Sequence, residues 1–313
     1  MVKDKENSKI VAGDIPAVLS RVSDVLASND DQSDSLSCKE CVRMPSVDDI
    51  NEMMRVVRAL IFPEFFTGNE ASSRVLPHRL RVSVNQLFVL LQKEIAAVMN
   101  YTARGKTTSG DIEDESASLT AEIIAMLPEI RRVLYTDVSA ICHNDPAVTE
   151  EAEVIYCYPS LKAMLHHRFS HLLFERGIPM LPRIISELSH SSTGIDIHPG
   201  ATIGEHFAID HGTGVVIGAT CIIGNNVTVY QGVTLGAKNF SYDNSGRPLD
   251  LPRHPIIEDN VTIYSNASVL GRITIGHDSV IGGNVWVTDS LPPFSRVVQG
   301  INRKESFTDG AGI

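Results

Sequence analysis

The chain has 313 residues, 43% of them hydrophobic and 21% charged, with a formal net charge of −11 at pH 7. This is an ordinary globular composition, long enough for one large domain or two smaller ones. The acidic balance disfavours nucleic acid or an anionic membrane surface as the main partner. No apolar run approaches the roughly 18 residues of a membrane span, and residues 1–9 have no signal-peptide core, so we expect a cytoplasmic protein.

Five cysteines are scattered along the chain: Cys38, Cys41, Cys142, Cys157 and Cys221. An odd and scattered set fits a reducing compartment better than a disulfide framework. The first two have the spacing of a redox or zinc motif, but no second pair accompanies them. We therefore assign them no function.

The first 45 residues are rich in Ser, Asp, Asn and Lys, which predicts a poorly ordered tail with one short helix at 15–26. Helical periodicity then begins. Apolar residues fall on one face over 50–60, after the expected N-cap Ser46, and again over 80–98. These two segments are predicted to be amphipathic helices.

The polar stretch 104–115 is predicted to be a loop. A third helical pattern, 123–134, contains Pro128, which predicts a kink or break there. Two more helical patterns follow, a long one at 161–173 and a short one at 183–188. Together the patterns predict an α-helical N-terminal half.

From Ile195 onward an aliphatic residue returns every sixth position. This aliphatic series comprises Ile197, Ile203, Ile209, Ile217, Ile223, Val229, Leu235, Ile257, Ile263, Val269, Ile275, Ile281 and Val287. Its phase slips by two residues at Val215 and Val216. A period of six fits neither a helix nor a hairpin sheet and is typical of a parallel β-helix, in which three hexads close one coil.

The period predicts the organisation of the chain. After the tail, an α-helical domain spans 46–190 and a β-helix spans 191–298. A loop at 236–256 interrupts the coils. Residues 299–313 are glycine-rich without a period, which predicts a flexible tail.

Histidines are not needed to stack coils, so His211 stands out beside the slip in phase. Asp196 and His211 are expected near corners of the same coil, where a carboxylate can orient an imidazole as a general base. Distorted backbone also tends to occur at functional sites. The alternative is a structural histidine that caps a turn or lines a subunit contact.

Two further segments could bind a small molecule. Arg253, held between prolines, is placed to clamp a carboxylate, although a solvated loop tip would look the same. Asp145 precedes Pro146 and forms either a plain turn or a carboxylate aimed at an amine. A predicted helix also carries three histidines with one pair at zinc-binding spacing, although an amphipathic helix surface is the simpler interpretation: His166, His167 and His171.

Five motifs occur in order between residues 144 and 298: Asp-Pro-Ala, His-Arg-x-x-His, Asp-Ile-His-Pro, Asp-His-Gly-Thr-Gly and Arg-His-Pro. With the hexapeptide repeat they resemble the serine O-acetyltransferase family. The resemblance implies an α+β chain in which a left-handed parallel β-helix follows the helical domain. It also implies transfer of acetyl from acetyl-CoA, as co-substrate, to the hydroxyl of L-serine in cysteine biosynthesis. No permanently bound cofactor and no metal are expected.

The resemblance implies a role for each candidate residue. His211 would be the general base, Asp196 would orient it, and the serine oxygen would attack the thioester directly, without an acyl-enzyme. Asp145 and Asp210 would hold the substrate ammonium.

The substrate carboxylate would be bound by Arg253, assisted by His254. A backbone N–H near Gly236 or Ala237 would stabilise the tetrahedral oxyanion. Acetyl-CoA would contact Gly236, Ala237, Ser265 and Gly283. Tyr264 stands where many relatives have glycine, which changes the contacts expected there.

The resemblance also implies partners. The site would lie between neighbouring β-helices of a homotrimer, and the helical domain would pair trimers into hexamers. L-cysteine would inhibit by occupying the serine site. The C-terminal Ile313 would dock into O-acetylserine sulfhydrylase, unless the tail ends in isoleucine by chance.

Three other functions fit parts of the pattern. A hexapeptide acetyltransferase acting on another hydroxyl or amine would need the histidine but not Asp145 and Arg253. A γ-class carbonic anhydrase would need three zinc ligands, for which His198, His211 and His254 are candidates. A scaffold that only docks the sulfhydrylase would not need a full set of catalytic residues.

Overall fold

The computed structural model describes residues 15–27, 43–66, 75–103, 109–239, 242–243, 245–247, 249 and 251–300. The chain divides into two compact units, Met1–Arg43 and Met44–Ile313, and each is described by itself. In the first unit, helix α1 (Ile15–Ala27) matches the predicted helix at 15–26. The predictions for Cys38, Cys41 and Ile313 lie outside the described residues.

The second unit begins with a helical region. Its helices are α2 (Val47–Ile61), α3 (Pro63–Phe66), α4 (Leu76–Ala103), α5 (Ser109–Ala125), α6 (Leu127–Asn144), α7 (Glu151–Cys157), α8 (Pro159–Glu175) and α9 (Leu181–Thr193). Helix α2 begins at the predicted N-cap, where the Ser46 hydroxyl accepts a hydrogen bond of 3.2 Å from the backbone N–H of Asp49.

The predicted break at Pro128 is confirmed, since α5 ends at Ala125 and Pro128 lies in the first turn of α6. The loop predicted over 104–115 is wrong from Ser109 onward. These polar residues form the start of α5 because Ile112 is buried there against the rest of the region. Helix α9 is longer than the predicted segment at 183–188, and α7 has no predicted counterpart.

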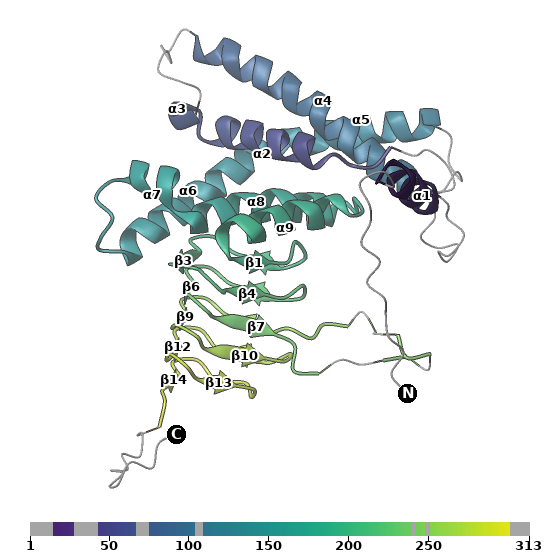
Figure 1. The fold of residues 1–313 in the computed structure, drawn as a ribbon. Helices are drawn as coiled ribbons and strands as arrows, with labels where there is room; N and C mark the ends of the chain where they lie inside the picture. The colour runs from purple at the N-terminus through teal and green to yellow at the C-terminus, as the bar shows by residue number, and fades with distance from the viewer. Residues whose placement is uncertain are drawn as a thin grey trace, which may run out of the picture. The chain divides into compact units, whose positions relative to one another are not determined.

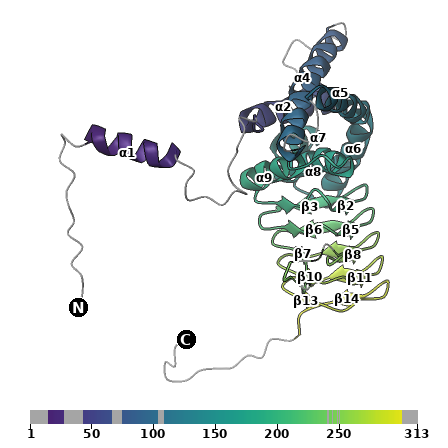
Figure 2. The ribbon, with the colours of Figure 1, turned by 90° about the vertical axis from the view of Figure 1, so that its right-hand side faces the viewer.

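The predicted parallel β-helix is confirmed, and its coils are drawn in Figure 1 and, turned by 90°, in Figure 2. Its strands are β1 (Asp196–Ile197), β2 (Thr202–Ile203), β3 (Ala208–Asp210), β4 (Val216–Ile217), β5 (Ile222–Ile223), β6 (Thr228–Tyr230), β7 (Thr234–Gly236), β8 (Ile256–Ile257), β9 (Thr262–Ile263), β10 (Ser268–Leu270), β11 (Thr274–Ile275), β12 (Val280–Ile281), β13 (Trp286–Val287) and β14 (Arg296–Val297). The first sheet contains β1, β4, β7, β10 and β13, the second contains β2, β5, β8 and β11, and the third contains β3, β6, β9, β12 and β14. Three faces per coil are the architecture that the hexapeptide period predicts.

The aliphatic series fills the interior of the coils. One column of it runs in register through the first sheet, and all of its members are buried: Ile197, Ile217, Leu235, Val269 and Val287. Burying one such side chain stabilises the fold by roughly 1.5–3 kcal/mol. The residues that recur every six positions in the sequence are therefore the side chains that fill the core of the coils.

A buried ion pair joins the helical region to the first coil. The guanidinium of Arg168 on α8 bonds both carboxylate oxygens of Asp137 on α6, at 2.7 and 2.9 Å, and donates to the backbone carbonyls of Ile203 and Gly204. The Asp137 carboxylate also accepts a hydrogen bond from the Phe207 N–H at 3.0 Å. The arginine of the His-Arg-x-x-His motif thus fixes both helices on the coil, and Figure 1 shows α8 and α9 lying over the first turn.

Among the described residues, one helix is long and apolar enough to cross a membrane, and it is α4. Core helices of water-soluble proteins pass the same test. Helix α4 contacts α2 and α5, and Leu87, Leu91 and Ile95 on it are fully buried. Its Glu94 is also fully buried and accepts a hydrogen bond of 2.8 Å from the Ser46 N–H. Packing inside the helical region therefore buries part of its apolar surface, while Val82 and Val89 remain exposed.

Candidate active site

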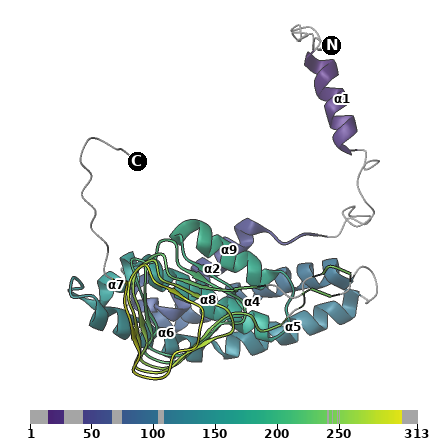
Figure 3. The same ribbon diagram turned by 90° about the horizontal axis from the view of Figure 1, so that it is seen from below.

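Two corners of the coils carry most of the predicted site residues. We call the corner between the third and first sheets, with Asp210 and His211, the histidine corner. The corner between the first and second sheets, with Arg253 and His254, is the arginine corner. Figure 3 looks along the stacked coils. Because the first sheet separates the two corners, one chain does not bring His211 and Arg253 together.

His211 projects from an enlarged turn. Five residues, 211–215, separate β3 from β4, whereas three, 231–233, separate β6 from β7 one coil later. The two extra residues are the slip in phase that the sequence shows. His211 has a backbone φ of +57° and its side chain is 75% exposed. The same left-handed backbone recurs at corners of the other coils, for example at Asn226, Asn260 and Asn266, so it is a feature of the repeat, and the exposure of the side chain is what distinguishes His211.

Asp145 reaches the histidine corner from the end of α6. Its carboxylate accepts a hydrogen bond of 2.6 Å from the Tyr158 hydroxyl and one of 2.8 Å from the Ala147 N–H. These two bonds, and then the charge of His211, hold the pKa of Asp145 below its usual value. Nearby, Asp210 Oδ1 lies 4.0 Å from His211 Nε2. The corner therefore offers an ionised carboxylate for a cation.

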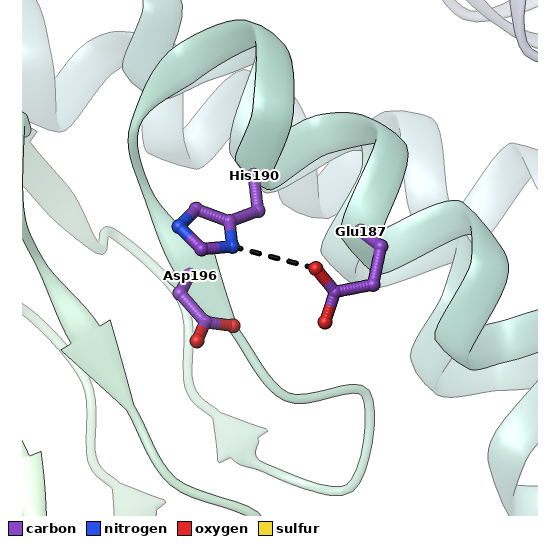
Figure 4. A group of neighbouring side chains, drawn as sticks. All are labelled: Glu187, His190 and Asp196. Carbon is purple, nitrogen blue, oxygen red and sulfur yellow. Dashed lines mark hydrogen bonds and ion pairs between the residues drawn. The ribbon is translucent and has the colours of Figure 1, made fainter. Parts of the chain in front are cut away.

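Asp196 lies at the same corner but faces α9. Its carboxylate is grouped with the side chains of Glu187 and His190, as Figure 4 shows. The backbone ties this segment to the turn of His211, because the Asp196 N–H donates to the Val215 carbonyl at 2.9 Å. In the part of the chain that the structure describes, no hydrogen bond joins the side chains of Asp196 and His211.

The arginine corner is built around a buried imidazole. His254 is 7% exposed and packs so closely on Gly218 that a Cβ there would lie 2.0 Å from the ring. The hydroxyl and N–H of Thr220 lie 2.9 and 3.1 Å from His254 Nδ1. Burial, and then the charge of Arg253, lower the pKa of His254 to about 4. The imidazole is therefore neutral at physiological pH.

A cavity of about 300 Å³ opens beside this imidazole. Its lining includes three basic residues, Lys238, Arg253 and Arg272. Arg272 donates to the backbone carbonyls of Thr220 and His254, which fixes its position. The arginine corner thus offers positive charge, whereas the histidine corner offers negative charge.

The residues predicted to contact acetyl-CoA also divide between the corners. Ser265 and Gly283 stack on successive coils at the histidine corner, where a Cβ on Gly283 would lie 3.1 Å from the Ser265 carbonyl oxygen. Gly236 ends β7, and Ala237 follows it toward the arginine corner. A continuous surface for one ligand would again need both corners.

Comparison with known proteins gives the family. A family model described as bacterial transferase hexapeptide (six repeats) matches residues 254–289. Over 292 residues the chain is 41% identical to a Synechococcus elongatus protein named "Serine acetyltransferase, plasmid", and the match covers 92% of each chain. The chain belongs to the serine acetyltransferase family. It is thereby an acyltransferase.

Other serine acetyltransferases are also similar to this chain, one in sequence and one in structure. A serine acetyltransferase of Bacillus subtilis is 48% identical over 167 residues, which cover 53% of this chain and 73% of the relative. The crystal structure of serine acetyltransferase isoform 3 from Entamoeba histolytica, in complex with cysteine, superposes with a TM-score of 0.70 at 29% identity. That match covers 94% of this chain and 96% of the other.

Within one chain of this fold, the three histidines considered for a carbonic anhydrase do not all lie at one corner. His211 lies at the histidine corner, and His254 lies at the arginine corner. The group of ligating side chains found among the described residues contains neither of them, nor His198. On α8, His166 and His167 are buried, and His167 stacks on His171 with ring centroids 5.6 Å apart. They therefore pack in the helical core.

Two tyrosines near the histidine corner have no role among the sequence predictions. Tyr158 contacts Asp145, as described above. Tyr230 pairs in register with Asp210 and stacks on Tyr264, with ring centroids 4.9 Å apart. Asp210, Tyr230 and Tyr264 each directly follow an inward aliphatic of the six-residue series, so that series could have placed them in one outward column. The contact of Tyr158 depends on helix packing and has no such signal.

Proposed function

We propose that this protein is a cytoplasmic serine O-acetyltransferase. It would transfer the acetyl group of acetyl-CoA to the hydroxyl of L-serine, giving O-acetyl-L-serine and CoA for cysteine biosynthesis. The observation that carries the proposal is the histidine corner, where an exposed His211 stands near the carboxylates of Asp145 and Asp210. Membership of the family supports the choice of serine as acceptor.

His211 would act as the general base. It removes the proton from the serine hydroxyl while the serine oxygen attacks the thioester carbonyl carbon. The tetrahedral intermediate then collapses, the C–S bond breaks, and the CoA thiolate takes the proton from His211. Asp196 would orient the imidazole, which is supported by the backbone bond from Asp196 to the turn that carries His211.

The substrate ends would be held by opposite charges. Asp145 and Asp210 would bind the ammonium group, while Arg253 and the neutral His254 would bind the carboxylate. Since these residues lie at two separated corners, we infer that the histidine corner of one chain meets the arginine corner of a neighbour.

A homotrimer would satisfy this arrangement at each of its interfaces. The outward face of the first sheet, which lies between the corners, exposes Val216 and Trp286, with 38% and 71% of their surface accessible. Apolar side chains of this kind suit packing against a second copy. The helical region would then pair trimers into hexamers.

Acetyl-CoA would lie along the coils at the same interface, near Ser265 and Gly283 of one chain. The backbone N–H of Gly236 or Ala237 would stabilise the oxyanion. L-cysteine has the same ammonium and carboxylate groups as L-serine, so it would compete for the same site. Ile313 would dock the chain into O-acetylserine sulfhydrylase.

The test compares two histidines of the first coil. His206 and His211 both have left-handed backbones, with φ of +56° and +57°, and asparagine tolerates that conformation. CoA release that depends on L-serine should fall by roughly 10²–10⁴-fold in His211→Asn and stay near wild type in His206→Asn. Full activity of His211→Asn would remove it as the base. Turnover of wild type with another hydroxyl or amine, but not with L-serine, would contradict the proposed acceptor.

A further inference from the structure

A cluster of three potential metal ligands lies beside the histidine corner. Glu187 and His190 are three positions apart on α9, and Asp196 begins β1. One ligand atom from each lies within 4.8 Å of the others. Figure 4 shows the three side chains converging on one point between the helix and the strand.

The distance between two of these ligands, which form a long hydrogen bond, is also compatible with a shared metal ion. His190 Nδ1 lies 3.4 Å from Glu187 Oε2, and N–H···O bonds are usually about 2.7–3.2 Å. In a tetrahedral zinc site with bonds of about 2.0 Å, neighbouring ligand atoms are roughly 3.3 Å apart. Glu187 and His190 therefore already stand at the spacing that a shared ion would need.

The sequence around these ligands also suits a metal. Glu187 to His190 is a Glu-x-x-His segment, an arrangement by which helices present a carboxylate and an imidazole to one ion. Arg183 pairs with Glu187 Oε1, so Oε2 is the oxygen directed at His190. Two carboxylates would neutralise a divalent ion, and the side chains of Glu187 and His190 are 49% and 44% exposed, so an ion can reach them.

We propose that Glu187, His190 and Asp196 bind a divalent transition-metal ion such as Zn²⁺, and that the bound ion inhibits the enzyme. The inhibitory part rests on the proposed function, in which Asp196 orients His211. Asp196 already faces α9 in this structure, so a metal bound there would hold its carboxylate in that orientation and prevent it from turning toward the imidazole. Metal occupancy would therefore weaken the general base without blocking the substrate groups.

Binding is measured first, because it does not depend on activity. All proteins carry Cys38→Ser and Cys41→Ser, since that pair has zinc spacing. Zn²⁺ competition with a chromogenic chelator, and the visible spectrum of added Co²⁺, should report one ion per chain. Binding should be lost in Glu187→Gln and in His190→Gln. It should persist in His277→Gln, a control in which another exposed histidine beside a carboxylate is removed.

Inhibition is measured by the loss of thioester absorbance with L-serine, with and without Zn²⁺. Saturating Zn²⁺ should lower the rate by about tenfold, less than the roughly 10²–10⁴-fold that a general base contributes because His211 itself is untouched, and a chelator should restore it. The ratio of the two rates should approach one in His190→Gln and stay at the wild-type value in His277→Gln.

The outcomes are distinguishable. Binding that is absent, or that survives both Glu187→Gln and His190→Gln, overturns the site. Binding without a change in rate overturns the inhibition alone. Metal binding at these ligands in a protein that does not acetylate serine would retain the site while the proposed function fails.

Discussion

The histidine and arginine corners differ in how an insertion changes a coil. At the histidine corner two extra residues lengthen one turn and expose His211. At the arginine corner a long loop between β7 and β8 returns to bury His254 against Gly218. Strand register continues past both, since Thr234 pairs with Val216 on one side and with Ser268 on the other. Pairing between the strands therefore stabilises the coils, and residues at the corners can be inserted for binding or catalysis without disrupting that pairing.

The largest expected effect is the recovery of activity when two inactive variants are mixed. It tests whether residues of the two corners act together across a subunit interface. His211→Asn and Arg253→Ala should each be nearly inactive alone. When the two variants are unfolded together and refolded at equal amounts, about a quarter of the interfaces would join an intact histidine corner to an intact arginine corner. Serine-dependent activity should then return to about one quarter of wild type, a gain of roughly 25- to 2,500-fold over His211→Asn.

Mixing each variant with itself is the control for this experiment. If mixed oligomers regain nothing although both variants assemble, the two corners do not meet between chains. Since the first sheet also separates the corners within one chain, His211 and Arg253 would then not belong to one site.

The contrast between the corners also shows what the sequence could predict. The six-residue series predicted the coils and the slip in phase, because each inward residue is a local consequence of the repeat. It could not predict that Asp196 faces Glu187 and His190, because that depends on where α9 packs. The prediction of a loop at the polar start of α5 was wrong for the same reason, because burial of Ile112 depends on tertiary packing.

The ion pair between Arg168 and Asp137 fixes α6 on the first coil, and so brings Asp145 to the histidine corner. Arg168→Met leaves Asp137 as a buried charge without its partner, and burial already raises the pKa of that carboxyl. The free energy of unfolding should fall by about 3–5 kcal/mol. The matched control is Arg132→Met, which breaks exposed pairs with Glu129 and Glu205 and should lower the free energy of unfolding much less. Equal losses in urea denaturation would contradict the distinction.

A smaller effect should appear with pH at the arginine corner. The pKa of His254 is about 4 in the folded chain against 6.5 for a free imidazole, chiefly because it is buried. The unfolded chain takes up the proton first, so the stability from this group is constant above about pH 6.5 and falls as the pH drops toward 4. The loss is at most roughly 3 kcal/mol. Urea midpoints at fixed protein concentration should therefore decline less steeply in His254→Gln than in wild type.

The control for that measurement is His277→Gln, which removes a half-exposed histidine far along the coils. Its stability should follow the wild-type curve between pH 7.5 and 4.5. A His254→Gln curve parallel to wild type would mean that the pKa of His254 is the same in the folded and the unfolded chain, and that burial does not lower it.

The smallest expected effect concerns Tyr158, whose hydroxyl donates to the Asp145 carboxylate at 2.6 Å. Removing one hydrogen bond to a charged group costs about 1.5–3 kcal/mol when nothing replaces it, and less where water can enter. Tyr158→Phe should therefore raise the KM for L-serine by roughly five- to tenfold, while kcat changes less than the KM because His211 is untouched. Tyr156→Phe is the matched control, since its hydroxyl bonds the Phe65 carbonyl away from this corner. An unchanged KM in Tyr158→Phe would mean that Asp145 does not need Tyr158 to face the substrate, and that the bond from the Ala147 N–H is enough to position it.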